Sequence, residues 1–189
     1  MERSYSSYNL RIYTRKALGS HIGYEGNSSA WNLIGERQVK GRGKGNTLRL
    51  PYEMFDGIDM RQGHTKAFYM TVTSYYYLYM SKEGQKGAVF AEDAYMKVLY
   101  GTERRWSFWN YSWRNYSVGF NGVVRYGTWV PPPTGAPSLS PSKSNAPSGS
   151  PSISYAPSQR PTSTSMTLIT RIDGSHTAQG IMFDVVAKQ

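Results

Sequence analysis

Five cationic side chains lie within thirteen residues of a glycine-rich stretch of the chain. They are Arg37, Lys40, Arg42, Lys44 and Arg49. The glycines between them let the backbone approach a partner closely, and the clustered positive charge favours an anionic partner. The same composition is also typical of a soluble hairpin tip that binds nothing. We therefore predict an anion-binding loop, with a plain surface turn as the alternative.

A second cluster combines arginine with aromatic side chains and holds three of the five tryptophans. Aromatic faces stack on sugar rings and on unstacked bases, while neighbouring guanidinium groups pair with negative charge. The cluster therefore predicts a binding surface for a glycan or for single-stranded nucleic acid. The alternative is a loop that covers the core with its Trp side chains turned inward. The candidate binding residues are Arg104, Arg105, Trp106, Trp109, Tyr111, Trp113 and Arg114.

Residues suited to catalysis are sparse. The chain has no cysteine, and its three histidines lie in turn or strand-entry contexts, without the Ser or Asp spacing of a catalytic triad. Glu53, Asp56 and Asp59 could offer oxygen atoms to Ca²⁺, but their spacing does not match an EF-hand loop and a solvated turn explains them. We expect no enzymatic activity, no cofactor and no bound metal.

The net charge of +10 is concentrated in residues 1–130, which carry 18 Lys/Arg against 10 Asp/Glu. This excess predicts a polyanionic partner such as an acidic polysaccharide, with nucleic acid as a less favoured one. Three Asn-x-Ser sequons, at Asn27, Asn110 and Asn115, are candidates for N-glycosylation. No signal peptide and no apolar run of about 20 residues is visible, so we expect no membrane span.

Residues 131–165 contain nine of the ten prolines and a ten-residue unit written three times, from Ala136, Ala146 and Ala156. Proline and serine here favour a solvated, extended spacer over a packed core. Ser/Pro-rich tracts of this kind are typical of stalks outside the cell, and an intracellular disordered linker is the alternative. We therefore expect an extracellular or cell-surface protein whose natural N-terminus lies upstream of Met1.

Residues 1–130 show the period-two alternation of β-strands. In residues 66–73, Phe68, Met70 and Val72 share one side, which predicts a half-buried strand. Further strands are expected at 8–14, 31–39, 75–80, 95–100 and 123–126. Short strands between Gly-rich turns, without helical spacing, predict an all-β fold, namely an antiparallel β-sandwich or jelly roll.

Residues 166–189 are expected to form a β-hairpin-like piece, with strands at 166–172 and 181–187. A hairpin of this size is marginal alone and needs a partner sheet. Two arrangements are open. The tail either opens a following module, or folds back and completes the first domain. We expect it to pair with an exposed edge of residues 1–130.

The order of short motifs resembles a repeat module of large, multi-copy, secreted proteins of diatoms and related algae. The motifs are Ile12-Tyr-Thr-Arg15, Trp31-Asn-Leu-Ile-Gly35, Gly63-His-Thr-Lys-Ala-Phe-Tyr-Met-Thr-Val72 and Asn121-Gly-Val-Val-Arg-Tyr126. The resemblance covers about 115 residues and implies location and a modular architecture, with further copies in a longer chain. It implies no particular chemistry.

Two functions follow as hypotheses. The first is a non-enzymatic cell-surface module that binds acidic glycans or another polyanion through the basic loop and the Trp/Arg cluster. The second is an intracellular nucleic-acid-binding protein, which would show a steep salt dependence. A structural spacer module without a ligand is a third possibility.

Overall fold

The computed structural model describes residues 7–42, 46, 48–73, 78–82, 84–104, 108, 116–128, 164–170 and 176–188. The chain divides into two compact units, one made of Met1–Val124 with Leu168–Gln189 and the other of Arg125–Thr167. Strands β9 (Val123–Thr128) and β10 (Thr164–Ile169) pair in a separate two-stranded sheet and have ends in both units. Most of the predicted spacer, 131–163, lies outside the described residues.

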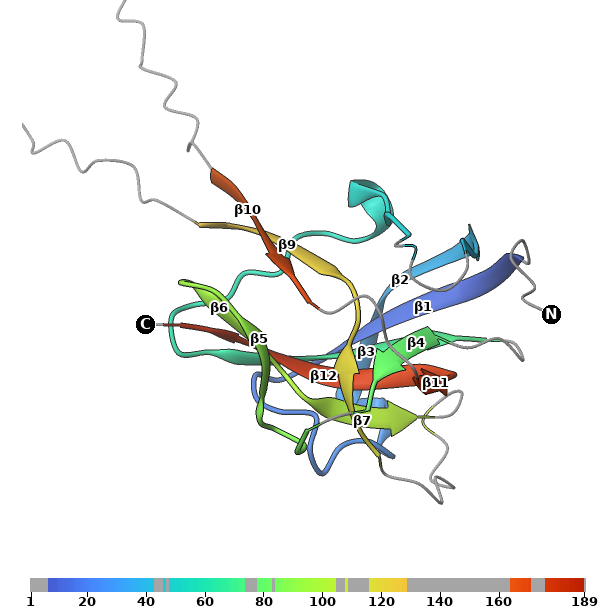
Figure 1. Ribbon diagram of the computed structural model, residues 1–189, viewed down its shortest axis with the longest axis horizontal. Helices are drawn as coiled ribbons and strands as arrows, with labels where there is room; N and C mark the ends of the chain where they lie inside the picture. The colour runs from blue at the N-terminus through green and yellow to red at the C-terminus, as the bar shows by residue number, and fades with distance from the viewer. Residues whose placement is uncertain are drawn as a thin grey trace, which may run out of the picture. The chain divides into compact units, whose positions relative to one another are not determined.

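One curled antiparallel sheet makes up the first unit (Figure 1). Its strands run in the order β11-β4-β8-β7-β12-β3-β1-β2, while β6 pairs with β12 and β5 pairs with β6. The strands are β1 (Ser7–Arg15), β2 (Trp31–Lys40), β3 (Thr65–Val72), β4 (Leu78–Ser81), β5 (Val89–Glu92), β6 (Met96–Leu99), β7 (Gly101–Arg104), β8 (Ser117–Phe120), β11 (His176–Ala178) and β12 (Gly180–Ala187). Two short 3-10 turns, η1 (Ser28–Ala30) and η2 (Tyr52–Met54), complete the regular structure of the described residues. The all-β prediction is confirmed, whereas the finer form of a sandwich or jelly roll is not.

Strand β3 differs from the expected half-buried strand because both of its faces are covered. Phe68, Met70 and Val72 share one face, as predicted. On the opposite face Tyr69 is 0% exposed and Thr71 is 1% exposed. Ala30, Trp31 and Phe108 cover this second face, which sequence alternation alone assigns to solvent.

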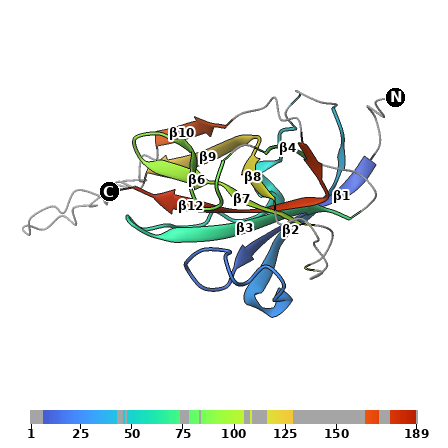
Figure 2. The same ribbon diagram turned by 60° about the horizontal axis from the view of Figure 1, so that its bottom comes forward.

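Strand β12 lies in the middle of the sheet, between β3 on one side and β6 and β7 on the other (Figure 2). Its sequence, Gly-Ile-Met-Phe-Asp-Val-Val-Ala, is apolar on both pleats, which is typical of a strand buried on both faces. Ile181, Met182, Phe183 and Val185 are each at most 5% exposed, and burying each contributes about 1.5–3 kcal/mol. Residues 180–187 therefore belong to the first unit, in its interior and not on an edge.

Close contact between β7 and β12 explains a glycine at the start of β7. A Cβ atom on Gly101 would lie 1.7 Å from the carbonyl oxygen of Met182, so no larger residue fits there. Strands β5, β7, β8 and β11 carry no clear alternation in the sequence, which does not predict them. In β7, Gly-Thr-Glu-Arg is a polar sequence, yet Thr102 is 0% exposed and Arg104 6%.

Two apolar clusters pack on the opposite faces of the sheet. Leu10, Val39 and Val72 form one cluster, and the ring of Phe183 stacks on that of Phe68 at 5.7 Å on the same face of the sheet as Val72. The other cluster consists of Trp31, Ala67, Tyr69 and Met182, with Phe108 packed against it. Because β12 supplies side chains to both faces, both depend on the C-terminal strand.

Candidate functional site

The connection between β1 and β2, residues 16–30, folds back over the sheet, and we call it the cover loop. It is fixed at its start by a hydrogen bond of 2.7 Å from the Gly19 N–H to the carbonyl oxygen of Thr65. Gly23 has a φ of +85°, a conformation that favours glycine and lets the loop turn sharply. At the end of the loop, the indole N–H of Trp31 donates to the carbonyl oxygen of Tyr24 at 3.0 Å.

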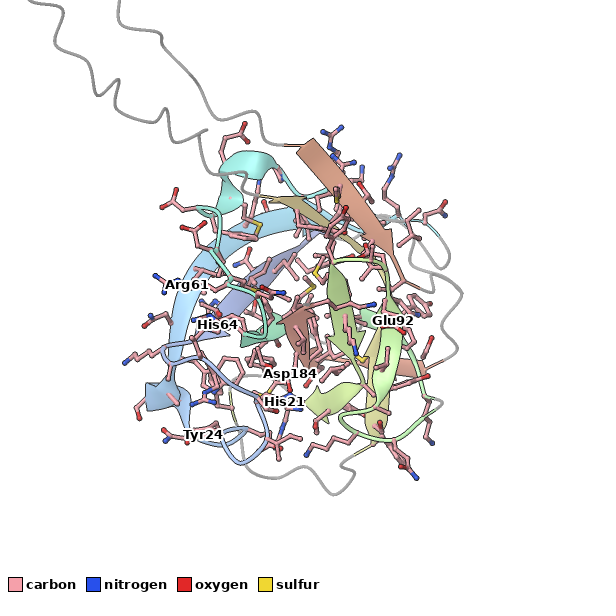
Figure 3. All side chains as sticks on the ribbon, turned by 90° about the vertical axis from the view of Figure 1, so that its left-hand side faces the viewer. His21, Tyr24, Arg61, His64, Glu92 and Asp184 are labelled. Atoms are coloured by element: carbon pink, nitrogen blue, oxygen red, sulfur yellow. The ribbon has the colours of Figure 1, made fainter. Side chains whose placement is uncertain are left out.

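A buried polar network joins the cover loop to β12 and β7 (Figure 3). Oδ1 of Asp184 lies 2.9 Å from Nδ1 of His21 and accepts from the His21 backbone N–H, also at 2.9 Å. Oδ2 of Asp184 accepts from the hydroxyl of Ser20 at 2.5 Å. On the other side of the ring, Nε2 of His21 lies 3.0 Å from Oγ1 of Thr102. Figure 3 shows His21 beside Asp184.

The order carboxylate, imidazole, hydroxyl is that of an acid–base relay, but its burial decides its role. His21 and Thr102 are 0% exposed and Asp184 is 1% exposed, so no substrate can reach the hydroxyl in this conformation. Burial alone would raise the pKa of Asp184, but the hydrogen bonds and charge of His21 and the hydrogen bond from Ser20 outweigh it and lower that pKa. The network therefore holds the cover loop on β12.

Little in the sequence points to this network. The sequence predicts a turn at His21, and 163 residues separate it from Asp184. The one available signal is Asp184 itself, a carboxylate in the apolar run 181–187. A charged residue at the centre of a buried strand needs a partner, because an unpaired buried charge is strongly unfavourable. The sequence does not say which residue that partner is.

Two arginines are buried beside the network. The guanidinium carbon of Arg15 lies 3.7 Å from the centroid of the Tyr24 ring, and its Nη1 donates to the carbonyl oxygen of Ser20 at 2.6 Å. Arg104 is 6% exposed, and its Nε has no hydrogen-bond partner among the described residues. Burial lowers the pKa of Arg104, and the charge of Glu25 opposes that shift. Both arginines are thus enclosed cations on the face that the cover loop protects.

Glu25 is a second carboxylate in this region, and it ties the cover loop to the segment before β5. Its Oε1 accepts from Nζ of Lys86 at 2.8 Å and its Oε2 from the Gly23 N–H at 2.7 Å. Burial would raise the pKa of Glu25, but these hydrogen bonds and the charge of Lys86 outweigh it, so the pKa is lowered. The cover loop is therefore held to β12 through Ser20 and His21 and to the segment before β5 through Glu25.

The predicted Trp/Arg cluster is only partly described. The candidate Arg104 faces the interior. So does Phe108, which lies between the candidates in the sequence, and its ring is 4.9 Å from that of Tyr69 and 5.1 Å from that of Tyr13. At these two positions the chain covers the core and does not present a ligand surface. The remaining candidates lie outside the described residues, and they are Arg105, Trp106, Trp109, Tyr111, Trp113 and Arg114.

Four of the five predicted basic residues are described, and all four are exposed: Arg37, Lys40, Arg42 and Arg49. We call this set the basic edge. Arg37 and Lys40 belong to β2, which ends the order of the described strands and pairs only with β1. They are three positions apart, so their side chains leave opposite sides of the strand. Lys44 lies outside the described residues.

The acidic residue of β2 itself, Glu36, is paired. Glu36 accepts a hydrogen bond of 2.9 Å from Nε of Arg11 on the neighbouring strand. Glu36 is also the single acidic residue between positions 31 and 50. The only carboxylate of the sequence between positions 31 and 50 is therefore held by Arg11.

The remaining predicted sites are the sequons and the acidic turn. Asn27 is exposed, and its Oδ1 accepts from the hydroxyl of Ser29 at 2.7 Å, whereas Asn110 and Asn115 lie outside the described residues. Across the described part of the chain, no three His, Asp or Glu residues are grouped as a metal site. No helix within that part is long and apolar enough to cross a membrane.

Comparisons with models of protein families, with curated proteins and with solved structures found no match to this chain.

Proposed function

We propose that this protein is a non-enzymatic extracellular or cell-surface module that binds acidic glycans or a similar polyanion through the basic edge. One observation carries the proposal. The exposed cations Arg37, Lys40, Arg42 and Arg49 gather along one terminal strand and the residues after it, and the nearby Glu36 is paired with Arg11. The buried network plays no part in it, because no ligand can reach that network.

The physical basis is the sum of weak contacts. A single exposed ion pair contributes only about 0–1 kcal/mol, so one cation on this edge would not retain a ligand. A polysaccharide with repeated sulfate or carboxylate groups can engage several cations at once, and each further contact adds to the first. Because the cations are exposed and salt screens such charges within about 8–10 Å, binding should weaken as salt rises.

The test is retention on an immobilised sulfated polysaccharide such as heparin, eluted with a salt gradient. The double variant Arg37→Ala, Lys40→Ala should elute at clearly lower salt than the wild type. The matched control is Lys16→Ala, Arg61→Ala, which removes one Lys and one Arg that are also exposed. The control should move little. Equal shifts of the two variants would mean general charge attraction and would sink the proposed site.

Nucleic acid is the principal competing partner, and the same proteins distinguish it. For single-stranded DNA the plot of log affinity against log salt becomes less steep by about 0.7 for each phosphate that the protein no longer neutralises. A wild type that binds DNA more tightly than it binds the sulfated glycan at the same salt would favour the intracellular alternative. If the protein binds neither DNA nor the sulfated glycan, the remaining alternative is a structural spacer module without a ligand.

Location outside the cell is a separate part of the proposal, supported by the Ser/Pro repeats of 131–165 and by the exposed sequon at Asn27. When the chain is expressed through a secretory pathway, Asn27 should carry a glycan. Mass spectrometry before and after enzymatic deglycosylation measures it, with Asn27→Gln as the control. An unmodified Asn27 would remove this support.

A further inference from the structure

The position of β12 makes a gap in the sheet that only a strand can fill. On one side Gly180–Val186 pair with residues 65–71 of β3. On the other side β12 pairs with residues 102–104 of β7 and 96–98 of β6. Without β12, the backbone N–H and C=O groups along both walls would lose their partners, and an open edge of this length is a template for pairing with another chain. We call this gap the strand slot.

The side chains that line the strand slot select a strand of one particular pattern. It takes apolar side chains on both faces, as Ile181, Met182 and Phe183 show. It takes a carboxylate at a single register position, where Ser20 and His21 hold Asp184. A slip of one residue would turn every side chain of β12 to the opposite face. Asp184 would then face the apolar side that holds Phe68, and Phe183 would leave that side.

The occupant reaches the strand slot after a long excursion of the chain. The 43 residues of the unit Arg125–Thr167 separate the two parts of the first unit in the sequence. The chain returns at Thr170, whose backbone N–H donates to the Gly122 carbonyl oxygen at 3.0 Å. The pairings of β11 with β4 and of β12 with β3, β6 and β7 would form in the same way whichever copy supplied the two strands.

We propose that the strand slot is a strand-exchange interface, and that its partner is β12 (Gly180–Ala187) of a second copy of this chain. Exchange leaves each pairing of β12 and each hydrogen bond of Asp184 intact and changes only the connection between them, so the two arrangements differ mainly in chain entropy. A tethered segment has an effective concentration on the order of millimolar. Exchange therefore competes with self-closure when copies are crowded to about that concentration, or when they refold together.

The absence of cysteine from the chain makes the exchange directly measurable. Val186 of β12 stands opposite Thr65 of β3, and opposed Cα atoms of antiparallel strands lie about 4.5–5.5 Å apart, within the range of a disulfide. Two full-length variants, Thr65→Cys and Val186→Cys, are unfolded, mixed, refolded over a range of protein concentrations and oxidised. A disulfide between them requires that one copy fill the slot of the other.

Exchange predicts a covalent heterodimer on a non-reducing gel, with a yield that rises with protein concentration during refolding. Lys16→Cys mixed with Val186→Cys is the control and should give much less, because Lys16 is outside the slot. The double variant Thr65→Cys, Val186→Cys should link within one chain at low concentration. If it does so while the mixed single variants give no heterodimer above the control at millimolar protein, the exchange is refuted. Failure of the double variant to link would refute the register itself.

Discussion

Replacement of Asp184 by asparagine tests the role of the buried network most directly. The substitution preserves the shape of the side chain and removes its charge, while Ser20, His21 and Thr102 stay in place. Asp184 accepts from the Ser20 hydroxyl and the His21 backbone N–H and lies 2.9 Å from Nδ1 of the His21 ring. An asparagine offers one oxygen acceptor, and its NH₂ group would face a donor.

The size of the effect follows from these contacts. A hydrogen bond to a charged group contributes about 1.5–3 kcal/mol, and a buried donor left unpaired costs about 1–3 kcal/mol. Because the contacts are coupled and not additive, we expect Asp184→Asn to lose about 2–4 kcal/mol of the free energy of unfolding. The first unit has about 150 residues, for which 1 kcal/mol lowers Tm by about 2–4 °C. The expected fall is therefore about 5–15 °C.

The pH dependence gives an independent check. Folding lowers the pKa of Asp184, so the folded state holds this proton less tightly than the unfolded state does. Its contribution to stability is present above about pH 4, the ordinary pKa of Asp, and is lost as the pH falls through the lowered value. Asparagine does not titrate. The difference in stability between wild type and Asp184→Asn should therefore shrink as the pH is lowered from 6 to 3.

Urea unfolding followed by tryptophan fluorescence at each pH measures both quantities. Asp59→Asn is the matched control, since it removes an exposed carboxylate and should change stability by less than about 0.5 kcal/mol. If Asp184→Asn behaves like Asp59→Asn at pH 6, or if its deficit is the same at pH 3 as at pH 6, the network does not hold the cover loop.

Three further predictions concern packing, ionisation and connectivity. Gly101→Ala should lower the free energy of unfolding by about 3 kcal/mol or more, because its Cβ would meet the Met182 carbonyl oxygen. The control Gly57→Ala has open space around it and should be neutral. Thermal unfolding compares the two variants, and equal Tm values would contradict the close approach of β7 to β12. Burial raises the pKa of Tyr69 to about 12, so the folded state holds the phenol proton more tightly and stability should fall as the pH rises from 10 to 12. In urea unfolding at each pH, Tyr69→Phe should lose less stability over this range than the wild type. An equal loss in both proteins would mean that other tyrosines cause it. A protease site placed at Gly149 should yield two fragments that stay together in gel filtration, because residues 168–188 remain in the sheet; separation without denaturant would show that β12 is not held as described.

Local pattern is sufficient for much of the fold. The strands expected at 8–14, 31–39, 66–73 and 181–187 correspond to β1, β2, β3 and β12 within one residue or so at each end. Each has a clear apolar alternation or a continuous apolar run, which local sterics and burial translate into a strand. The short strands β5, β7, β8 and β11 lack such a pattern and form because neighbouring strands offer them hydrogen-bonding partners.

The candidate sites divide in the same way. Exposure of Arg37, Lys40, Arg42 and Arg49 follows from their charge, because isolated cations are rarely buried. Residue type predicts Arg104 beside a ligand, and it is instead enclosed, since the sequence does not show that the cover loop lies above β7. The exposure of isolated charged residues is thus predictable from residue type. Burial of a charged residue such as Arg104 depends on which distant segments of the chain pack over it.

By itself the sequence determined that this chain forms strands, that its charge lies in residues 1–130 and that a Ser/Pro tract interrupts it. Those properties depend on neighbours in the chain. Tertiary structure alone decided that β12 occupies the middle of the sheet and that Asp184 meets His21 across 163 positions. Pairing between distant strands is set by packing on both faces and by the need to satisfy a buried carboxylate. The residues next to β12 in the sequence do not show which distant strand or side chain meets either requirement.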